Sequence, residues 1–554
     1  MTYLGRAFKT LLFSTLCISA TMVAGAQTRS TAKPVPNKTN LDSIASHATN
    51  ASLIGRGSNQ PISVYIPYFD KADKAGGIKE FTFDLTGSTD PKDIVSARLY
   101  LSDINDRYSP THPLQLIGEG APEGDKLAIK GNKGPIRWTP NKCVWLVYTI
   151  ADNAKEGNIV QTKPVKLQMD NCDSFDFVST PPTSYEIVLQ RTLLWSPGDK
   201  GAASYRIPGI VTCADGSLVV SADRRKNNSA DLPNDIDVEV KRSFDGGKTW
   251  SQPITVAKGS PSYGYGDAAI AVNGNTITMM FIGGKTGLWG STPENRLNIY
   301  VSQSFNSGRS WSAPRKISDP LYKKGKWPGG FIGSGRGIVT SKGVIIFVGA
   351  FRTSAEWGGK MANVLVYSED GGKTWKTSNP LRFNGDESKV VELADGRLLV
   401  SSRNRDKNPN NRSYAITSNL GMTWTQLAQW PEINGNNCNA SILRYSLIKE
   451  GAKKDRLLHT LPANEERTNL TLFLSTDEGK TWPVKKVICK GEAAYSELTV
   501  MPDGTIGIIS EEDDHPAYDI YFTRVSLEWL TNGKDTTDKP SANMLKGVPF
   551  PKRR

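Results

Sequence analysis

Cysteine and histidine are scarce in this sequence. Its 554 residues include six cysteines and four histidines. Five of the cysteines follow residue 26, an odd number without metal-ligand spacing, and the histidines are scattered along the chain. The sequence therefore predicts a fold that does not depend on a disulfide framework, and it predicts no metal or other cofactor. One bridge, between Cys143 and Cys172, stays open as an alternative.

Long apolar runs are missing except near the N-terminus. Two basic residues precede an apolar run at residues 11–23, and small residues follow it at positions 24–26. This is the pattern of a cleavable secretory signal. It predicts a signal peptide at residues 1–26 and a protein that is secreted or periplasmic. No other segment is long and apolar enough to span a membrane, so no membrane span is expected.

The chain is basic, with a net charge of +13, but it lacks a dense basic stripe or a nucleic-acid-binding motif. We therefore expect no nucleic-acid partner. A positive surface suits an anionic small substrate instead, because its potential draws anions toward the protein.

Residues 27–184 have the pattern of an antiparallel β-sandwich. Short alternating apolar runs are separated by turn residues, and no amphipathic helical stretch interrupts them. The runs lie at residues 62–66, 81–85, 97–101, 126–129, 144–150 and 165–169. Residues 179–184, rich in Ser, Thr and Pro, are expected to link this domain to the next one.

The predicted sandwich is a candidate carbohydrate-binding module. Five aromatic side chains could stack on sugar rings, although residues of this type more often belong to a hydrophobic core. They are Trp138, Trp145, Tyr65, Tyr68 and Tyr100.

An eight-residue motif recurs five times after residue 185. It reads Ser or Thr, any residue, Asp or Asn, any residue, Gly, any residue, Thr or Ser, and Trp. The copies occupy residues 243–250, 304–311, 368–375, 417–424 and 475–482, so they recur at similar intervals along the chain. Such regular repeats indicate a propeller or an array with one supersecondary unit per repeat. Within the motif, the acidic or amide side chain can bind turn amides, Gly permits positive φ, and Trp can be buried between neighbouring units.

These copies resemble the Asp boxes of the sialidase superfamily, which are hairpin turns on propeller blades, remote from the active site. The resemblance and the repeat spacing together predict a six-bladed propeller at residues 185–532. Strand-like residues 186–194 and 519–530 could pair in one blade and close the ring, leaving no open edge. Residues 533–554 form a polar, basic tail to which no fold is assigned.

Six further residues carry a resemblance to bacterial exo-α-sialidases of glycoside hydrolase family 33. Residues 205–208 (YRIP) match the sialidase signature, with Arg206 as the first substrate-binding arginine. The other members follow in the order and at the intervals of that family. They are Asp231, Glu387, Arg403, Arg467 and Tyr495. Each part alone is weak, but the ensemble is specific, and the resemblance covers residues 186–530.

The resemblance implies a role for each of these side chains. Arg206, Arg403 and Arg467 would grip the carboxylate of sialic acid, which planar guanidinium groups can bind with paired, charge-assisted hydrogen bonds. Tyr495 would be the nucleophile, since a second carboxylate would be repelled by the carboxylate of the substrate. A phenol is a weak nucleophile, so Glu387 would take its proton.

Asp231 would be the general acid for the leaving oxygen, and then the base for water. Three of these assignments have rivals nearby in the sequence. Asp235 and Asp237 compete with Asp231, and Glu392 competes with Glu387. Arg225 and Asp267 match positions that contact the 4-hydroxyl side of the sugar in the family, and Arg224 competes with Arg225 for that role.

The function implied is that of a retaining exo-α-sialidase acting on sialylated glycoproteins, glycolipids or oligosaccharides, without metal or cofactor. Two alternatives remain from the sequence. One is a non-catalytic sialic-acid-binding lectin on the same scaffold, and the other is a trans-sialidase. Degenerate lectins of this type usually lose the Tyr, the Glu or an Arg, and all of these residues are present here.

Overall fold

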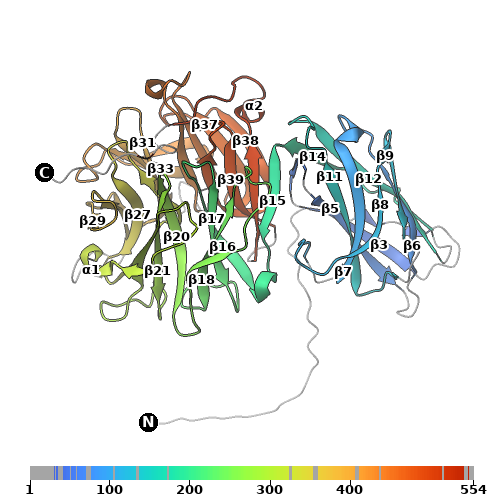
Figure 1. The fold of residues 1–554 in the computed structure, drawn as a ribbon, viewed down its shortest axis with the longest axis horizontal. Helices are drawn as coiled ribbons and strands as arrows, with labels where there is room; N and C mark the ends of the chain where they lie inside the picture. The colour runs from blue at the N-terminus through green and yellow to red at the C-terminus, as the bar shows by residue number, and fades with distance from the viewer. Residues whose placement is uncertain are drawn as a thin grey trace, which may run out of the picture.

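A computed structural model describes residues 30–541, apart from residues 32, 35–40, 50, 58, 70–75, 104–106, 133–135, 171–173, 323–326, 354–359, 406–410, 436–437 and 514–516, together with residue 547. Strands dominate these residues, and they form two bodies that lie side by side in Figure 1. The predicted all-β architecture, a sandwich followed by a six-bladed propeller, is confirmed. The predicted signal peptide lies outside the described residues.

The N-terminal body is a sheet that folds over on itself. Strands β8 and β10 share only two residue pairs, and there the sheet turns from one layer into the other. The first layer holds β1 (Ser30–Thr31), β3 (Leu41–Ala48), β5 (Asn59–Phe69), β11 (Lys142–Ile150), β7 (Ile94–Asp103) and β8 (Gln115–Gly120). The second holds β10 (Lys126–Gly131), β6 (Ile78–Asp84), β12 (Ile159–Met169), β13 (Ser174–Asp176) and β2 (Lys33–Pro34), with short strands β4 (Leu53–Gly55), β9 (Pro122–Glu123) and β14 (Thr183–Val188) at its margins.

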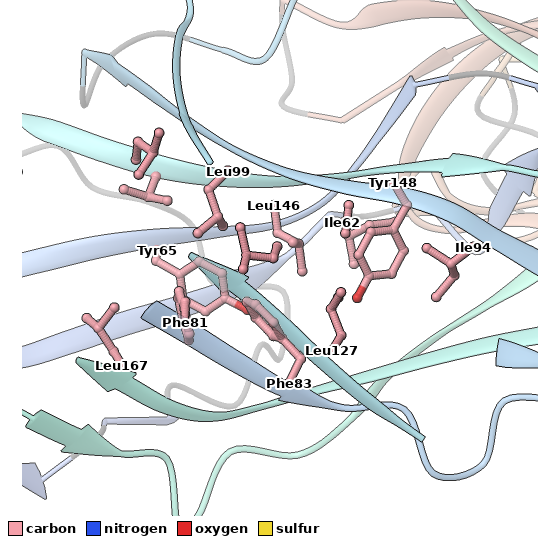
Figure 2. Packing of buried hydrophobic residues seen from close by; sticks show 14 of the residues in the cluster. Ile62, Tyr65, Phe81, Phe83, Ile94, Leu99, Leu127, Leu146, Tyr148 and Leu167 are labelled. Carbon is pink, nitrogen blue, oxygen red and sulfur yellow. The ribbon is translucent and has the colours of Figure 1, made fainter. Parts of the chain in front are cut away.

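Alternating apolar residues from the two layers meet in one core (Figure 2). Aromatic rings fill its centre, where Phe81 stacks on Phe83 at 4.4 Å and lies 4.8 Å from Tyr65. Two of the candidate sugar-stacking residues, Tyr65 and Trp138, are buried in this core and have no exposed face for a sugar. Tyr68 is 51% exposed.

The other two candidate stacking residues, Tyr100 and Trp145, are half-buried. Cys143 is buried beside Ser102, and its candidate partner Cys172 lies outside the described residues.

The sandwich extends beyond the predicted boundary at residue 184. Strand β14 pairs with β12 and with β4, so residues expected to form a linker and the first propeller strand belong to the sandwich. The pairing is possible because the side chains of residues 185–188 (YEIV) alternate between the two faces of the sheet, as in an ordinary strand. The propeller begins at β15 (Gln190–Trp195), in the blade that lies beside the sandwich in Figure 1.

Five blades follow one another along the chain. Blade 1 comprises β16 (Ser204–Thr212), β17 (Leu218–Arg225), β18 (Ile236–Ser243) and β19 (Ile254–Ala257), and blade 2 comprises β20 (Gly264–Asn273), β21 (Thr276–Gly284), β22 (Asn298–Ser304) and β23 (Arg315–Lys316), with β25 (Gly335–Arg336) beside β20. Blade 3 comprises β24 (Gly329–Ile332), β26 (Ile338–Val339), β27 (Ile345–Arg352), β28 (Met361–Ser368), β29 (Lys376–Thr377) and β30 (Arg382–Phe383). Blade 4 comprises β31 (Gly385–Glu392), β32 (Leu398–Asn404), β33 (Asn411–Thr417) and β34 (Ala428–Asn434), and blade 5 comprises β35 (Ser441–Ser446), β36 (Arg456–Pro462), β37 (Thr468–Ser475) and the first part of β38 (Val484–Val500).

Blade 6 closes the ring. It joins the second part of β38 to β39 (Ile506–Glu512) and β40 (Asp519–Val525), and β40 pairs with β15 from the start of the propeller. The prediction that the two ends of the domain share a blade is confirmed, with the first strand shifted to Gln190–Trp195. The ring is closed in this blade, because its outer strand β15 comes from the other end of the domain.

The Asp boxes are turns that bind their own backbone. In the first box, Ser243 donates to the Asp245 carboxylate at 2.8 Å, and the amides of Gly247 and Thr249 donate to these two side chains at 2.9 and 3.0 Å. The Trp250 ring reaches across to blade 6, where it meets Phe522 at 5.3 Å. The structural role predicted for the boxes is confirmed, because each contact fixes a turn or joins two blades.

Part of the predicted tail has a fixed place on the propeller. After α2 (Leu527–Leu530), the buried guanidinium of Arg456 pairs with Asp535 at 2.9 Å and with Asp538 at 2.7 Å. The Ser541 amide then donates to the Tyr445 carbonyl at 2.9 Å. These contacts hold residues 534–541 against blade 5 although they form neither helix nor strand. One further helix, α1 (Ser318–Leu321), follows blade 2.

Candidate active site

The two ends of each blade differ in chemistry. In blade 4, the strand register pairs Ser388 with Ser402 at one end and Glu392 with Leu398 at the other. Leu398 lies opposite Thr417, which is the first residue of the fourth Asp box. Glu387 and Arg403 therefore lie at the end of the blade opposite to the box. We call these two ends of the propeller the site end and the Asp-box end.

At the site end, one guanidinium joins the predicted nucleophile to its predicted base. Arg403 donates through the same nitrogen, Nη1, to the Glu387 carboxylate and to the Tyr495 hydroxyl, which is 3.4 Å away. The three residues come from β32, β31 and β38, so two blades contribute to this contact. Residues far apart in the sequence thus meet at one atom.

The environment keeps the Tyr495 phenol protonated. Burial, followed by the negative charge of Glu387, raises the pKa of Tyr495 well above its usual range, and Arg403 and Arg467 act in the opposite direction. A neutral phenol is a poor nucleophile, so an attack by this oxygen needs a base that removes its proton. Glu387 is the carboxylate that shares a hydrogen-bond donor with it.

Arg206 is held rigidly by a carboxylate that the sequence analysis did not single out. Its Nε and Nη2 donate to the two oxygens of Glu511 at 2.8 and 3.0 Å, and the amides of Ile207 and Tyr495 donate to the same carboxylate. Burial lowers the pKa of the Arg206 guanidinium, but the charge of Glu511 outweighs it, so the pKa lies above its usual range. The guanidinium lies 5.4 Å from the centre of the Tyr495 ring.

Arg467 approaches the same ring from another side. It precedes β37 in a turn with a φ of 54°, and its guanidinium lies 5.6 Å from the centre of the Tyr495 ring. Its carbonyl accepts from the Ala493 amide at 2.8 Å, which ties the turn to β38. The three arginines predicted to bind a carboxylate therefore surround one tyrosine.

Asp231 lies on the loop between β17 and β18, where its side chain is 80% exposed. The buried guanidinium of Arg225 donates to it at 2.7 Å and lies 3.8 Å from Asp223. Arg225 thus links the loop carboxylate to a buried one.

Asp223 and Asp267 form a pair of carboxyl groups beneath this loop. The Asp267 amide donates to the Asp223 carboxylate at 3.2 Å, and Asp267 has a φ of 53°, a conformation that an L-residue seldom adopts. Burial raises the pKa of Asp223 to about 7, although Arg225 lowers it, and burial together with the charge of Asp223 raises the pKa of Asp267 well above its usual range. The pair therefore holds protons at a pH where ordinary carboxyl groups have lost them.

The rivals named from the sequence have other partners. Arg224, on the opposite face of β17, donates to the Lys200 carbonyl and to Asp237. Lys226 binds Asp235 and Asp237 at 2.6 and 2.8 Å. Glu392 lies toward the Asp-box end and accepts from Ser341.

Several residues of the site were missed by the sequence analysis. Glu511, Tyr518, Cys438 and Asp223 all contact or adjoin the predicted residues, and Cys438 and Tyr518 share an apolar cluster with Tyr495. Glu511 had a signal in the sequence, because a carboxylate at the end of the apolar residues 506–509 needs a partner when the strand is buried.

Neither a metal cluster nor a membrane-spanning helix is present in the part of the chain that the structure describes. No group of three or more His, Cys, Asp or Glu side chains there could hold a metal ion. Likewise, none of the helices within the described ranges is long and apolar enough to cross a membrane.

The chain resembles known proteins along much of its length. A family profile described as a BNR repeat-like domain matches residues 228–508, just over half of the 554 residues. A sialidase of Bacteroides fragilis is 34% identical over 342 residues, which are 57% of this chain and 61% of that protein. A sialidase of Micromonospora viridifaciens is 31% identical over 360 residues, 60% of this chain and 53% of that protein. The chain therefore spans less than two thirds of either relative.

Solved structures share the fold. The Hadza microbial sialidase Hz136 superposes with a TM-score of 0.66 at 23% identity, over 88% of this chain and 99% of that one. A Trypanosoma rangeli sialidase in complex with 2,3-difluorosialic acid, described as a covalent intermediate, superposes with a TM-score of 0.50 at 25% identity, over 60% of this chain and 55% of that one. This chain therefore belongs to the BNR repeat-like domain family, and in sequence it is similar to sialidases.

Proposed function

We propose that this protein is a retaining exo-α-sialidase that removes terminal sialic acids through a covalent intermediate on Tyr495. One observation carries the proposal: Arg403 donates to both Tyr495 and Glu387, while Arg206 and Arg467 flank the same tyrosine ring. A tyrosine paired with a carboxylate and surrounded by three arginines suits a substrate whose reacting carbon carries a carboxylate.

In the first step, the Tyr495 oxygen attacks the anomeric carbon as Glu387 takes the phenolic proton. The glycosidic bond breaks, and Asp231 gives its proton to the leaving oxygen. The sialyl group remains bound to the enzyme as an aryl glycoside. In the second step, Asp231 removes a proton from water and the water oxygen attacks the same carbon. The bond between that carbon and the Tyr495 oxygen breaks, and the proton on Glu387 returns to that oxygen. Two displacements at one carbon retain its configuration.

The surroundings suit each role. Arg403, Arg206 and Arg467 would bind the substrate carboxylate, and their charges would stabilise the phenolate character that develops on Tyr495 during attack. Asp231 is exposed, so water can reach it for the second step. Arg225, which binds Asp231, and Asp267 would contact the 4-hydroxyl side of the sugar.

The natural substrates would be sialylated glycoproteins, glycolipids or oligosaccharides that a secreted or periplasmic enzyme meets. This location rests on the expected signal peptide at residues 1–26. The sandwich is proposed as a carbohydrate-binding module, for which Tyr68, Tyr100 and Trp145 remain as candidate stacking residues. A glycan array with the whole protein and its Tyr68→Ala, Tyr100→Ala and Trp145→Ala variants tests this, and unchanged binding in all three contradicts it.

Release of free sialic acid from a fluorogenic sialoside tests the proposed activity. Proton NMR of the first product should show the configuration of the substrate. Binding of the sialoside without release would indicate a lectin. Transfer of the sialyl group to added lactose, in place of hydrolysis, would indicate a trans-sialidase.

A further inference from the structure

A turn of the sandwich reaches the propeller close to the candidate active site. This docking turn, residues 107–112, connects β7 to β8. Three of its side chains converge on the Asp199 carboxylate of the propeller. The hydroxyls of Thr111 and Ser109 donate to it, the latter at 3.4 Å, and His112 Nε2 lies 3.5 Å away.

A fourth side chain of the turn reaches a second propeller carboxylate. The Arg107 guanidinium lies 3.9 Å from Asp519, which also accepts from the Ser196 hydroxyl at 2.6 Å. Asp519 is buried, and burial together with the charge of Asp513 raises its pKa to about 8, while Arg107 lowers it. Arg107 is thus a counter-charge, supplied by the sandwich, for a carboxyl group that the propeller buries.

Both carboxylates adjoin the predicted substrate site. The Asp199 carbonyl accepts from the Tyr205 hydroxyl at 3.1 Å, and the Tyr205 ring stacks on Trp195 at 5.9 Å. Tyr205 directly precedes Arg206 in β16. Asp199, which the docking turn contacts, is therefore linked through Tyr205 to the backbone of Arg206, the first predicted carboxylate-binding arginine.

The second carboxylate leads to the other side of the same arginine. Asp519 directly follows Tyr518, whose ring centre lies 5.0 Å from the Arg206 guanidinium. Tyr518 also belongs to the apolar cluster that contains Tyr495. Two segments thus flank Arg206, one containing Tyr205 and the other Tyr518. The docking turn contacts Asp199, which binds Tyr205, and Asp519, which follows Tyr518.

We propose that the docking turn is a positioning element of the active site, which holds the Tyr205–Arg206 segment and Tyr518 through Asp199 and Asp519. The sandwich then contributes to the geometry of the active site, in addition to forming a separate domain. This inference rests on the proposed function, because Arg206 is taken to bind the substrate carboxylate. It assigns the turn an effect on substrate affinity that exceeds its effect on the chemical step.

Arg107→Met tests the proposal with a matched control at the same domain interface. Glu156 of the sandwich accepts from Ser526 at 3.1 and 2.5 Å, and Ser526 follows the other end of β40 from Asp519. With a fluorogenic sialoside, Arg107→Met should raise KM about fivefold with kcat within twofold of the native value, as loss of uniform binding does. Arg107→Lys should restore KM, and Glu156→Ala should lower the melting temperature without changing KM.

Hydrogen exchange gives a readout that does not need turnover. Arg107→Met should speed exchange in peptides covering residues 204–212 and 517–525, and Glu156→Ala should not. Thr111→Val, which loses one donor to Asp199, should do the same more weakly and serves if Arg107→Met does not fold. Absence of sialidase activity in the unsubstituted protein would contradict the proposed function but not the positioning role of the turn. Unchanged KM and exchange in both turn variants, or an equal rise of KM in Glu156→Ala, would overturn the positioning role.

Discussion

The two ends of the propeller are built from the same strands but obey different rules. At the Asp-box end the turns repeat from blade to blade. In the first, third and fifth boxes, the Ser hydroxyl donates to the Asp carboxylate and accepts from the Gly amide. At the site end no sequence motif recurs from blade to blade, and buried charges are placed against one another. Repetition therefore marks the residues that build this fold, and its absence marks those assigned to chemistry.

Tyr495→Phe should cause the largest loss of turnover among changes at the site end. The substitution removes one oxygen, so kcat for a sialoside should fall by roughly 10⁴- to 10⁶-fold, as it does when a covalent nucleophile is lost. The melting temperature should stay within a few degrees of the native value, since the ring keeps its apolar neighbours. Near-native turnover in this variant would rule out the assigned nucleophile.

Trp482→Ala should destabilise the Asp-box end. This ring is buried in the fifth box and lies 5.6 Å from Trp430 in an edge-to-face contact, so its removal should cost about 3–5 kcal/mol of unfolding free energy. The kcat of the folded fraction, measured well below the melting temperature, should be unchanged. Trp424→Ala, in the half-buried fourth box, is the matched control and should cost less. An equal cost, or a large loss of kcat, would contradict the division between the two ends.

Glu387→Gln keeps the shape of the base but removes its charge. It should lower kcat by about 10²-fold, the range expected for one positioned proton acceptor. The pKa of Tyr495 should fall as well, because the charge of Glu387 helps to raise it. Spectroscopic titration of the phenol, with Tyr495→Phe as the blank, measures this change. A Tyr495 pKa that does not move would show that the two groups are not coupled.

Carboxyl groups at the two ends should respond to pH in opposite ways. Asp223 has a folded pKa of about 7, above its unfolded value, so its contribution to stability is lost as pH rises from about 4 through 7. Asp223→Asn stays neutral, and its stability relative to the native protein should improve by about 2–3 kcal/mol between pH 5 and pH 8.

Asp477 of the fifth box is the control for this comparison. Burial raises its pKa, but hydrogen bonds from Thr481 outweigh this, and the net pKa lies below its usual value. Any stability that it adds is lost only in acid below that value. Urea unfolding of Asp477→Asn at pH 5 and pH 8 should give one constant difference from the native protein. A constant difference for Asp223→Asn as well would contradict the raised pKa.

Repetition is also what made part of this molecule predictable from its sequence. Five copies of one motif revealed the period, and the period gave the number of blades. The sandwich boundary was placed at residue 184, because residues 179–184 have the composition of a linker. Only the pairing of β14 with β12 shows that the chain there is still sandwich.

The site was predictable in its members but not in its supports. The six residues could be named because their order and intervals resemble a known family. The choice between Arg224 and Arg225 depends on which face of β17 each occupies, and the sequence does not state that face. Glu511 could not be assigned for a different reason. Its partner Arg206 lies 305 positions earlier, and only the closure of the ring brings the two residues together.

Labelling with 2,3-difluorosialic acid tests directly whether Tyr495 forms the covalent intermediate. The protein would be incubated with this compound, digested and analysed by mass spectrometry, with Tyr495→Phe treated in parallel. We expect a fluorosialyl group on the peptide that contains Tyr495, slow release of that group by water, and no adduct in the variant. An adduct on Glu387 or Asp231, or hydrolysis of ordinary sialosides with inverted configuration, would contradict it.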